Sequence, residues 1–404
     1  EARVGIWDSG TGNIAIRNGN INSTWLGVYT DGASGYITVE NGNITGQISG
    51  IECNNGKNAT ILGGSITGTE AFGIYANTTG QCNVDGGIVK GGDVGFNIVS
   101  SGSHRIYNNA RVEGTNIGAC LTENAVLWIG GSSQVIGNVG VYHASSQSLT
   151  VSDTPTITAN KTDGIALAST GSLTMYSGTV TGASAGIANN VSGGSFGIYA
   201  GGSGKTTING GEIKGSIGAY LLGGQNIQVL GGNISGTGSA GIESSSTGQC
   251  LVDGGVIYGI DRGINILSGY ARIYNYATVQ GGNHGAYMSG NSELWVGGNS
   301  ATVGGAYGIY SEGNSVITIS DSPGITGNAA AGLKTAVGSA GSITIYGGTI
   351  SGYGAGIEIS SNTWFLFTGG TATSSYGNGI NFTDRTMETR IDGATIRGAN
   401  AGVH

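Results

Sequence analysis

Short runs of alternating apolar and polar residues recur along the whole chain, and each run ends at glycine or a small polar residue. Residues 59–75, ATILGGSITGTEAFGIY, hold three such runs: ATIL, SIT and GIY. Alternation with a period of two is typical of a strand with one buried face. Because a strand this short cannot bury its apolar face alone, we interpret residues 59–75 as one turn of a β-solenoid.

The apolar centre of the second run returns at steps of 21 to 25 residues, apart from one step of 33. A fixed period in this range indicates a repeat architecture. Stacked turns would bury these centres in one column and pair each strand with parallel strands above and below it. The sequence therefore predicts an all-β fold, a right-handed parallel β-helix (β-solenoid) of about 17 turns of ~23 residues, with three short strands per turn. The centres are Ile21, Ile44, Ile66, Val89, Val112, Val135, Ile157, Val180, Ile213, Ile234, Ile257, Val279, Val303, Ile325, Ile350, Ala372 and Ile396.

A block of seven turns occurs twice. GQCNVDGG at 80–87 returns as GQCLVDGG at 248–255, and VSDTPTITAN at 151–160 returns as ISDSPGITGN at 319–328. We therefore expect one β-helix domain over 1–404, which is also a segment of a longer protein. Its two copies cover about 30–186 and 206–357, and an insertion at 187–205, either a loop or an extra partial turn, joins them.

Composition narrows the functional classes. Glycine supplies 83 residues without a strict three-residue period, which excludes collagen, and only 2 residues are proline. Charged residues are 9% of the chain, the net charge is −8 and no basic run exists, so we expect no nucleic-acid partner. No stretch of 18 apolar residues occurs, so we expect no membrane insertion. Low charge with much Gly, Ser, Thr and Asn favours an extracellular protein, secreted or at the cell surface, and we expect a monomer.

The cysteines give no sign of a metal or redox site. Cys53, Cys82, Cys120 and Cys250 form neither a CxxC motif nor a paired framework. Cys82 and Cys250 fall on inward strand positions, so we interpret them as small buried hydrophobic residues. The sequence predicts no cofactor and no metal.

The alternation also predicts which side chains point outward. On the first run of the turn, an outward arginine is followed one turn later by an outward tryptophan, and an aspartate and a tyrosine lie beside them. The tryptophan would stack on a sugar ring, the arginine would take an acidic group or hydroxyls, and the other two would orient hydroxyls. Alternatively, these groups only stabilise the sheet through cation–π contact. The candidate binding residues are Asp85, Arg105, Tyr107 and Trp128, with Asp253, Arg272, Tyr274 and Trp295 as the second copy.

The third run of the turn predicts a second outward row that is rich in tyrosine. Like the arginine–tryptophan sets, this row could bind a glycan or could stabilise the sheet by stacking like on like. Its tyrosines are Tyr29, Tyr75, Tyr142, Tyr220, Tyr287 and Tyr310.

The turn period and the inward Ile/Val spacing resemble those of the right-handed parallel β-helix proteins, the pectate-lyase-like superfamily. That group includes pectin-degrading enzymes, phage tailspikes and the passenger domains of bacterial surface adhesins. The resemblance covers the whole chain and is strongest to the adhesin, or autotransporter passenger, type. It implies a fold far more than a function.

The resemblance implies an enzyme only if catalytic residues are present. Polygalacturonase-like enzymes use paired aspartates, a Gly-His-Gly and an Arg-x-Lys, and these strings are absent here. His104, His143, His284 and His404 do not share one outward column, and a single acid beside each arginine is a weak calcium site. Threonine rows that could bind ice are interrupted by charged and apolar residues.

We therefore expect a non-catalytic, extracellular β-helix segment of a bacterial surface adhesin that binds a glycan or host-surface polysaccharide. One alternative is a polysaccharide lyase or glycoside hydrolase of the same fold. A second is a structural spacer, or stalk, that binds nothing.

Overall fold

The computed structural model describes residues 2–183, 196–299, 302–360, 362–383 and 387–404. In these ranges the chain forms 51 strands and no helix, and every third strand belongs to the same parallel sheet. The result is a β-solenoid of about 16 turns, which confirms the predicted all-β parallel β-helix. The chain forms two compact units, Glu1–Thr206 (unit 1) and Thr207–His404 (unit 2). Across the described residues, none lies in a helix long and apolar enough to cross a membrane.

Each turn of unit 1 supplies one strand to each of three sheets, here called A, B and C. Sheet A holds β1 (Val4–Asp8), β4 (Leu26–Thr30), β7 (Ser49–Asn55), β10 (Phe72–Thr78), β13 (Val94–Ile98), β16 (Ile117–Leu121), β19 (Val139–His143), β22 (Ile165–Leu167) and β25 (Phe196–Ala200). Sheet B holds β2 (Ile14–Ile16), β5 (Tyr36–Val39), β8 (Asn58–Ile61), β11 (Cys82–Val84), β14 (Ser103–Ile106), β17 (Val126–Ile129), β20 (Ser148–Val151) and β23 (Ser172–Met175). Sheet C holds β3 (Asn20–Asn22), β6 (Asn43–Gly46), β9 (Ser65–Gly68), β12 (Ile88–Gly91), β15 (Arg111–Gly114), β18 (Gln134–Gly137), β21 (Thr156–Ala159) and β24 (Thr179–Thr181).

Unit 2 repeats the same order, and the division between the units falls within β26 (Lys205–Ile208). Its sheet A holds β28 (Ile217–Leu221), β31 (Ala240–Ser244), β34 (Arg262–Ile266), β37 (His284–Gly290), β40 (Tyr307–Gly313), β43 (Ala331–Thr335), β46 (Ala355–Ser360) and β49 (Asn378–Thr383). Its sheet B holds β29 (Asn226–Val229), β32 (Gln249–Val252), β35 (Tyr270–Ile273), β38 (Glu293–Val296), β41 (Val316–Ile319), β44 (Ser342–Ile345), β47 (Trp364–Phe367) and β50 (Thr389–Ile391). Its sheet C holds β27 (Glu212–Gly215), β30 (Asn233–Gly236), β33 (Val256–Gly259), β36 (Thr278–Gly281), β39 (Thr302–Gly305), β42 (Gly324–Gly327), β45 (Thr349–Gly352), β48 (Thr371–Ser374) and β51 (Thr395–Arg397).

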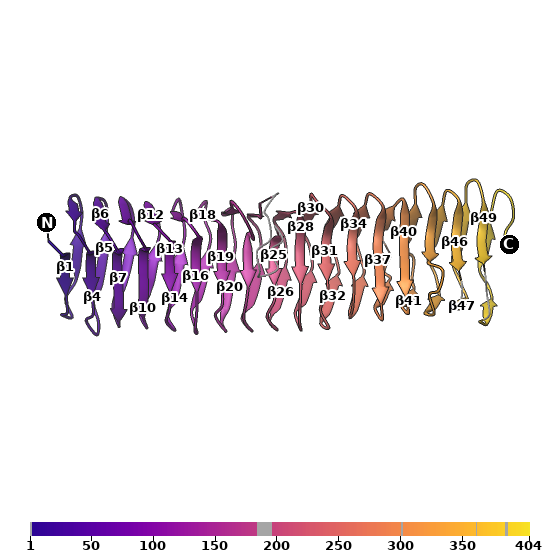
Figure 1. The fold of residues 1–404 in the computed structure, drawn as a ribbon, viewed down its shortest axis with the longest axis horizontal. Helices are drawn as coiled ribbons and strands as arrows, with labels where there is room; N and C mark the ends of the chain where they lie inside the picture. The colour runs from indigo at the N-terminus through magenta and orange to yellow at the C-terminus, as the bar shows by residue number, and fades with distance from the viewer. Residues whose placement is uncertain (1, 184–195, 300–301, 361, 384–386) are drawn as a thin grey trace. The chain divides into compact units, whose positions relative to one another are not determined.

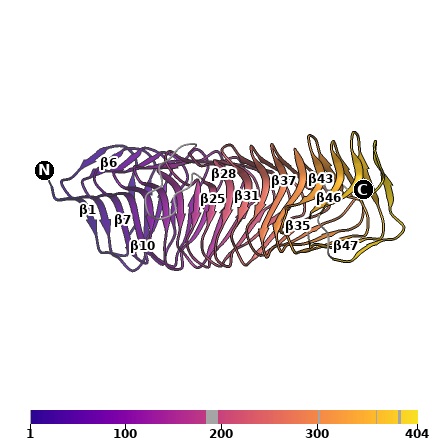
Figure 2. The same cartoon turned by 45° about the vertical axis from the view of Figure 1, so that its right-hand side comes forward.

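Successive strands of a sheet lie side by side, as β4, β7, β10 and β13 show in Figure 1 and β28 and β31 show in Figure 2. The predicted inward column is confirmed in each unit by the strand register. In unit 1, Ile44 pairs with Ile66, which pairs with Val89, and all three are buried. In unit 2, Ile234 and Ile257 pair in the same way. Branched side chains on a column of this kind pack against their own equivalents in the turns above and below.

Residues with a left-handed backbone conformation shape the corner that follows sheet B. In three successive turns of unit 1 they are Asn108 (φ 53°), Gly131 (φ 63°) and Asp153 (φ 64°). A Cβ atom on Gly131 would lie 2.4 Å from the backbone nitrogen of Asn108, so only glycine fits that turn. Asparagine and aspartate tolerate the left-handed region better than other side chains do, so they occupy the neighbouring turns.

The longest turn of unit 1 contains the predicted insertion. Strand β25 pairs directly with β22, where Ile198 lies opposite Ile165, so the 33-residue step belongs to one turn. The extra residues lie between β24 and β25, and 184–195 are outside the described residues.

A buried lysine, which the sequence pattern did not reveal, connects separate turns near the start of unit 1. Lys57 lies in the corner between β7 and β8, and its side chain is fully buried. Its Nζ lies 2.7 Å from Asp8 Oδ2 and donates a hydrogen bond of 2.8 Å to the Gly12 carbonyl. The hydrogen bond with Lys57 lowers the pKa of Asp8. The lysine thereby holds the third turn to the first.

The inward positions of unit 1 also contain His104, which should make the unit sensitive to acid. His104 is buried, its Nδ1 accepts a hydrogen bond from the Cys82 backbone nitrogen, and burial lowers its pKa to about 4. A histidine that is neutral in the fold but protonated in the unfolded chain stabilises the fold above its unfolded pKa of about 6.5. That contribution is lost progressively as the pH falls from about 6.5 to about 4.

Between pH 7 and pH 4, we predict that the free energy of unfolding falls by about 3 kcal/mol less in His104→Leu than in the wild type. The urea unfolding midpoint of the full chain at both pH values measures this difference. Hydrogen exchange of the β14 backbone amides is the second measurement. His404→Gln is the matched control, because His404 is exposed. Equal acid sensitivity of His104→Leu and the wild type would contradict the assignment.

Candidate functional site

The four candidate residues of each copy meet at one end of sheet B. We call Asp85, Arg105, Tyr107 and Trp128 cluster 1, and Asp253, Arg272, Tyr274 and Trp295 cluster 2. Arg105 lies on β14 directly opposite Trp128 on β17, and Arg272 on β35 lies opposite Trp295 on β38. The aspartate and the tyrosine of each cluster directly follow the last residue of their strands, at the corner that leads to sheet C. All eight side chains are partly buried.

Each arginine forms a bidentate ion pair with the aspartate one turn below it. Arg105 Nε donates to Asp85 Oδ1 at 2.8 Å, and its Nη2 donates to Oδ2 at 2.5 Å. In cluster 2, Arg272 Nε donates to Asp253 Oδ1 at 2.9 Å, and Nη2 reaches both carboxylate oxygens at 2.6 Å. The hydrogen bond with Asp85 raises the pKa of Arg105, so the guanidinium stays charged. This fork-to-fork geometry fixes the guanidinium plane.

The tyrosine and the tryptophan of each cluster form a tilted ring pair. The ring centroids of Tyr107 and Trp128 are 4.8 Å apart with an angle of 35° between the planes. Those of Tyr274 and Trp295 are 5.3 Å apart with an angle of 39°. In cluster 2 the Arg272 guanidinium lies 5.7 Å from the tyrosine ring and 5.9 Å from the tryptophan ring, within cation–π range.

A serine and an aspartate that were not among the predicted residues extend each cluster. Trp128 Nε1 donates to Ser152 Oγ at 2.7 Å, and Ser152 Oγ donates to Asp153 Oδ2 at 3.2 Å. The backbone nitrogen of Gly131 donates to the same Asp153 oxygen at 3.0 Å. The signal was visible, because VSDTP and ISDSP are part of the duplication.

The second copy reproduces this hydrogen-bonded chain. Trp295 Nε1 donates to Ser320 Oγ at 2.8 Å, and Ser320 Oγ donates to Asp321 Oδ2 at 3.1 Å. The Gly298 backbone nitrogen donates to that oxygen at 2.9 Å. Each tryptophan ring is therefore held by one hydrogen bond and one ring contact.

A glycine packed against each tyrosine ring makes the cluster possible. A Cβ atom on Gly130 would lie 2.9 Å from both the Tyr107 ring and the Asp153 carboxylate. At the equivalent position, a Cβ atom on Gly297 would lie 2.9 Å from Asp321 and 3.1 Å from the Tyr274 ring. The ring and the carboxylate therefore converge over bare backbone, which leaves no room for a side chain.

The clusters are kept in both copies, whereas the first strand position of sheet A and the third strand position of sheet C have each changed in three turns. On sheet A, three apolar residues of the first copy correspond to a cation, a histidine and a tyrosine. On sheet C, a cation, an acid and an apolar residue correspond to an aromatic residue, an amide and a glycine. The sheet A pairs are Val94 and Arg262, Ile117 and His284, and Val139 and Tyr307; the sheet C pairs are Lys90 and Tyr258, Glu113 and Gln280, and Ile136 and Gly304. Single positions are kept elsewhere, such as Asn97 with Asn265 and Tyr142 with Tyr310 on sheet A, but in each cluster four side chains that contact one another are kept together.

The predicted tyrosine row lies on sheet A, but it is not continuous. Tyr29 and Tyr75 are separated by Glu52, Tyr142 lies between Cys120 and Ala166, and Tyr220 lies next to Glu243. Within the row, only Tyr287 and Tyr310 are direct neighbours, with stacked rings 5.7 Å apart.

Around that pair the structure adds residues that the row did not include. The His284 ring stacks on Tyr307 at 5.5 Å, and the Arg262 guanidinium lies 4.0 Å over the Tyr287 ring. Tyr287 donates a hydrogen bond to Glu312, and burial raises the pKa of Tyr287 to about 12. These contacts hold the rings of sheet A against one another.

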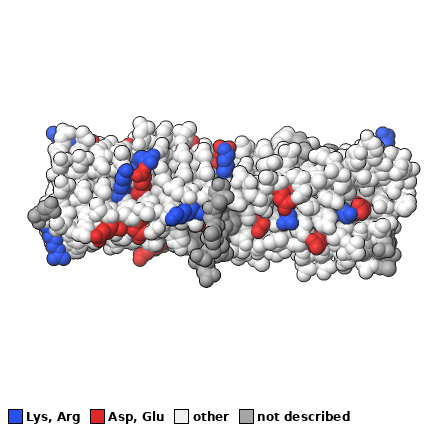
Figure 3. Space-filling view, turned by 45° about the horizontal axis from the view of Figure 1, so that its top comes forward, with Lys and Arg blue, Asp and Glu red and all other residues white. Residues whose placement is uncertain are grey.

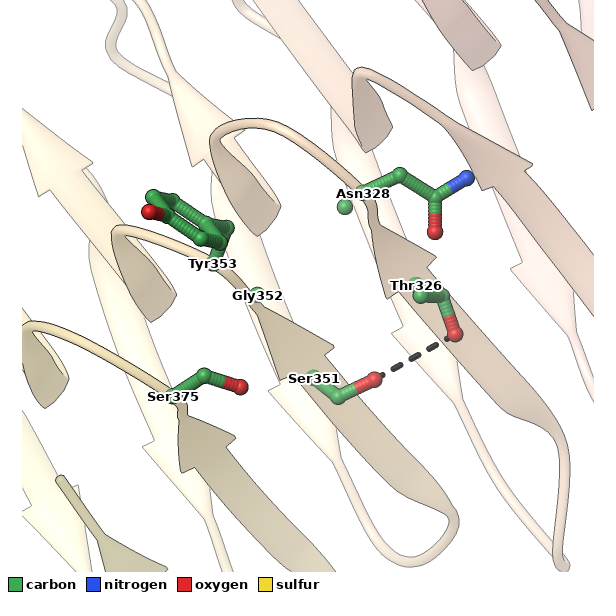
Figure 4. A pocket seen from close by; sticks show the side chains of 7 residues that line it. Thr326, Asn328, Ser351, Gly352, Tyr353 and Ser375 are labelled. Atoms are coloured by element: carbon green, nitrogen blue, oxygen red, sulfur yellow. Dashed lines mark hydrogen bonds between the residues drawn. The ribbon is translucent and has the colours of Figure 1, made fainter. Parts of the chain in front are cut away.

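Three hollows lined by described residues lie along the corner between sheets C and A, and none of them is lined by a cluster residue. One in unit 1, of about 390 Å³, is lined by Lys90, Arg111 and Glu113, and one in unit 2, of about 370 Å³, is lined by Tyr258 and Gln280. A smaller one of about 170 Å³ is lined by short polar side chains; there Ser351 donates to Thr326 at 3.2 Å beside Tyr353 (Figure 4). Charged side chains on the face drawn in Figure 3 occur in small groups of both signs.

Among the described residues, no group of three or more His, Cys, Asp or Glu side chains could hold a metal ion. Cys53, Cys82 and Cys250 are buried free thiols, as the inward prediction for Cys82 and Cys250 requires, and Cys120 is half-buried.

Comparisons with protein-family models, with curated proteins and with solved structures find no match to this chain. The geometry and the internal duplication alone therefore identify clusters 1 and 2 as the candidate site.

We predict a measurable coupling between Asp85 and Arg105 in a double-mutant cycle of unfolding free energies. The cycle uses Asp85→Ala, Arg105→Ala and the double variant, and the expected coupling is about 1 kcal/mol. Solvent screening keeps it this small, because the Arg105 side chain is 37% exposed. The control is the Arg17–Glu40 pair, whose side chains are 74% and 45% exposed, and whose coupling should be below about 0.3 kcal/mol. Equal coupling in both cycles would show that the bidentate geometry adds no stability.

Proposed function

We propose that this chain is a non-catalytic, extracellular β-helix segment of a bacterial surface adhesin, and that clusters 1 and 2 bind a glycan. The observation that carries the proposal is the retention of the arginine, aspartate, tyrosine and tryptophan in both copies. Outward side chains without a role would be free to drift in either copy, as those at the first strand position of sheet A have done.

The geometry suits stacking on a sugar. Trp128 is held by its hydrogen bond to Ser152 and by the Tyr107 ring, so binding would cost little side-chain entropy. The tilted pair offers two aromatic surfaces on neighbouring turns, and sugar rings stack their apolar faces on such surfaces. Two equivalent clusters give two sites per chain.

The low density of charge supports an extracellular glycan partner. With charged residues at 9% and a net charge of −8, the surface has neither the basic patch of a nucleic-acid binder nor a field to steer polyanions. The resemblance to passenger domains of bacterial adhesins supports the cellular setting.

We predict that Trp128→Ala/Trp295→Ala weakens binding to glycan-array hits about 30-fold, because truncating a central aromatic contact costs about 2 kcal/mol. Titration calorimetry with a hit should give two sites for the wild type and one for either single variant. Trp7→Ala is the matched control, because Trp7 is 65% exposed and belongs to neither cluster.

Unchanged binding by the double variant would remove the clusters as the site. Binding by neither protein would favour the spacer alternative. Unsaturated products or new reducing ends from polysaccharide incubated with the wild type would favour the lyase or hydrolase.

A further inference from the structure

Each cluster contains an arginine, but its charge is already balanced by the aspartate of the same cluster. In both clusters the Nε and Nη2 groups are committed to the aspartate one turn below, at distances of 2.5 to 2.9 Å. A guanidinium that is already bound in a bidentate pair has little attraction left for a second carboxylate. The sequence predicted that Arg105 and Arg272 take an acidic group or hydroxyls, and the ion pairs disfavour the acidic group.

The charge that remains beside each aromatic pair is negative. Asp85 and Arg105 cancel, and Asp153 adds one negative charge; Asp253 and Arg272 cancel, and Asp321 adds another. Asp153 and Asp321 are both exposed. Each also takes the left-handed conformation, with φ of 64° and 60°, and its carboxylate accepts hydrogen bonds from the serine that binds the tryptophan and from a glycine one turn earlier.

One oxygen of each exposed carboxylate is open to solvent. The hydrogen bonds that Asp153 accepts from Gly131 and Ser152 both go to Oδ2, and no donor among the described residues reaches Oδ1. Asp321 repeats the pattern, with Gly298 and Ser320 as donors to Oδ2. The tryptophan Nε1 is meanwhile occupied by the serine. The Oδ1 atoms of Asp153 and Asp321 can therefore accept a hydrogen bond from a donor such as a hydroxyl.

A further tyrosine continues the same corner. Tyr176 lies one turn after Ser152, and Tyr346 lies one turn after Ser320. Both directly follow the last residue of their strand, as Tyr107 and Tyr274 do in earlier turns. Their exposed fractions are 56% and 57%. Each copy thus presents, in order, an aromatic pair, an acceptor carboxylate and an exposed aromatic ring.

We infer that clusters 1 and 2 select neutral, hydroxyl-rich glycans and reject anionic ones, with Asp153 and Asp321 accepting hydrogen bonds from sugar hydroxyls. This inference rests on the proposed function, since it assigns a ligand class to the same site. A carboxylated sugar placed on the aromatic pair would bring its negative charge against Asp153 or Asp321, and like charges across an interface disfavour binding. A neutral sugar donates O–H groups to the same oxygens at no such cost.

The test is an array in which each neutral oligosaccharide is printed beside the same backbone carboxylated at C6. For the full wild-type chain, the neutral member of each bound pair should bind at least about tenfold more tightly. Asp153→Asn/Asp321→Asn should bring that ratio close to one, because asparagine keeps the shape and the acceptor for Gly131 and Ser152 but removes the charge. Thermal melting of this variant would verify that it folds.

The matched control is Glu70→Gln/Glu212→Gln, which removes one acid from each unit. Glu70 follows β9 and Glu212 lies on β27, so this variant should leave the ratio of neutral to carboxylated binding unchanged. Tighter binding of carboxylated members, or a ratio that survives Asp153→Asn/Asp321→Asn, would overturn the inference. If that binding were still lost in Trp128→Ala/Trp295→Ala, the proposed function would stand. Absence of binding to every printed sugar would overturn both.

Discussion

The structure depends on one constraint: each short strand has a parallel partner one turn above and another one turn below. A strand of three to seven residues cannot bury its apolar face alone, so the inward Ile and Val side chains are stable only when the turns keep the same register. A shift of one residue would turn every inward side chain outward. The inward columns from Ile44 to Val89 and from Ile234 to Ile257 are the direct result.

The same constraint makes the outward face a regular grid. Register fixes the neighbour of each outward side chain, so Arg105 must lie against Trp128 and Arg272 against Trp295. The corners add directions that the strands cannot provide. Asp153 and Asp321 take the left-handed conformation after sheet B and bind the serines that hold the tryptophans, and a glycine one turn earlier leaves space for a tyrosine ring.

The duplication separates what the fold requires from what it only permits. Sheets A and C show that a β-helix tolerates apolar, charged or aromatic residues at the same outward position, because such residues contact mainly solvent and their own column. In unit 2 this freedom produced the stacked group around His284 and Tyr310. Against that background, both copies repeat an Asp–Arg ion pair, a Tyr–Trp ring pair and a hydrogen-bonded Trp–Ser–Asp chain, and ligand binding is our proposed reason.

The sequence by itself determined the fold class, the inward columns and the membership of the clusters. It could do so because periods of 2 and about 23 residues place each side chain without knowledge of any distance. Tertiary structure alone decided how the polar groups pair. The bidentate contact of Arg105 with Asp85, the hydrogen bonds through Ser152 to Asp153 and the burial of Lys57 depend on rotamers and corner dihedrals, which periodicity does not specify. For that reason the sequence indicated where a ligand could bind, whereas the sign of the charge left to meet it emerged only from the packed structure.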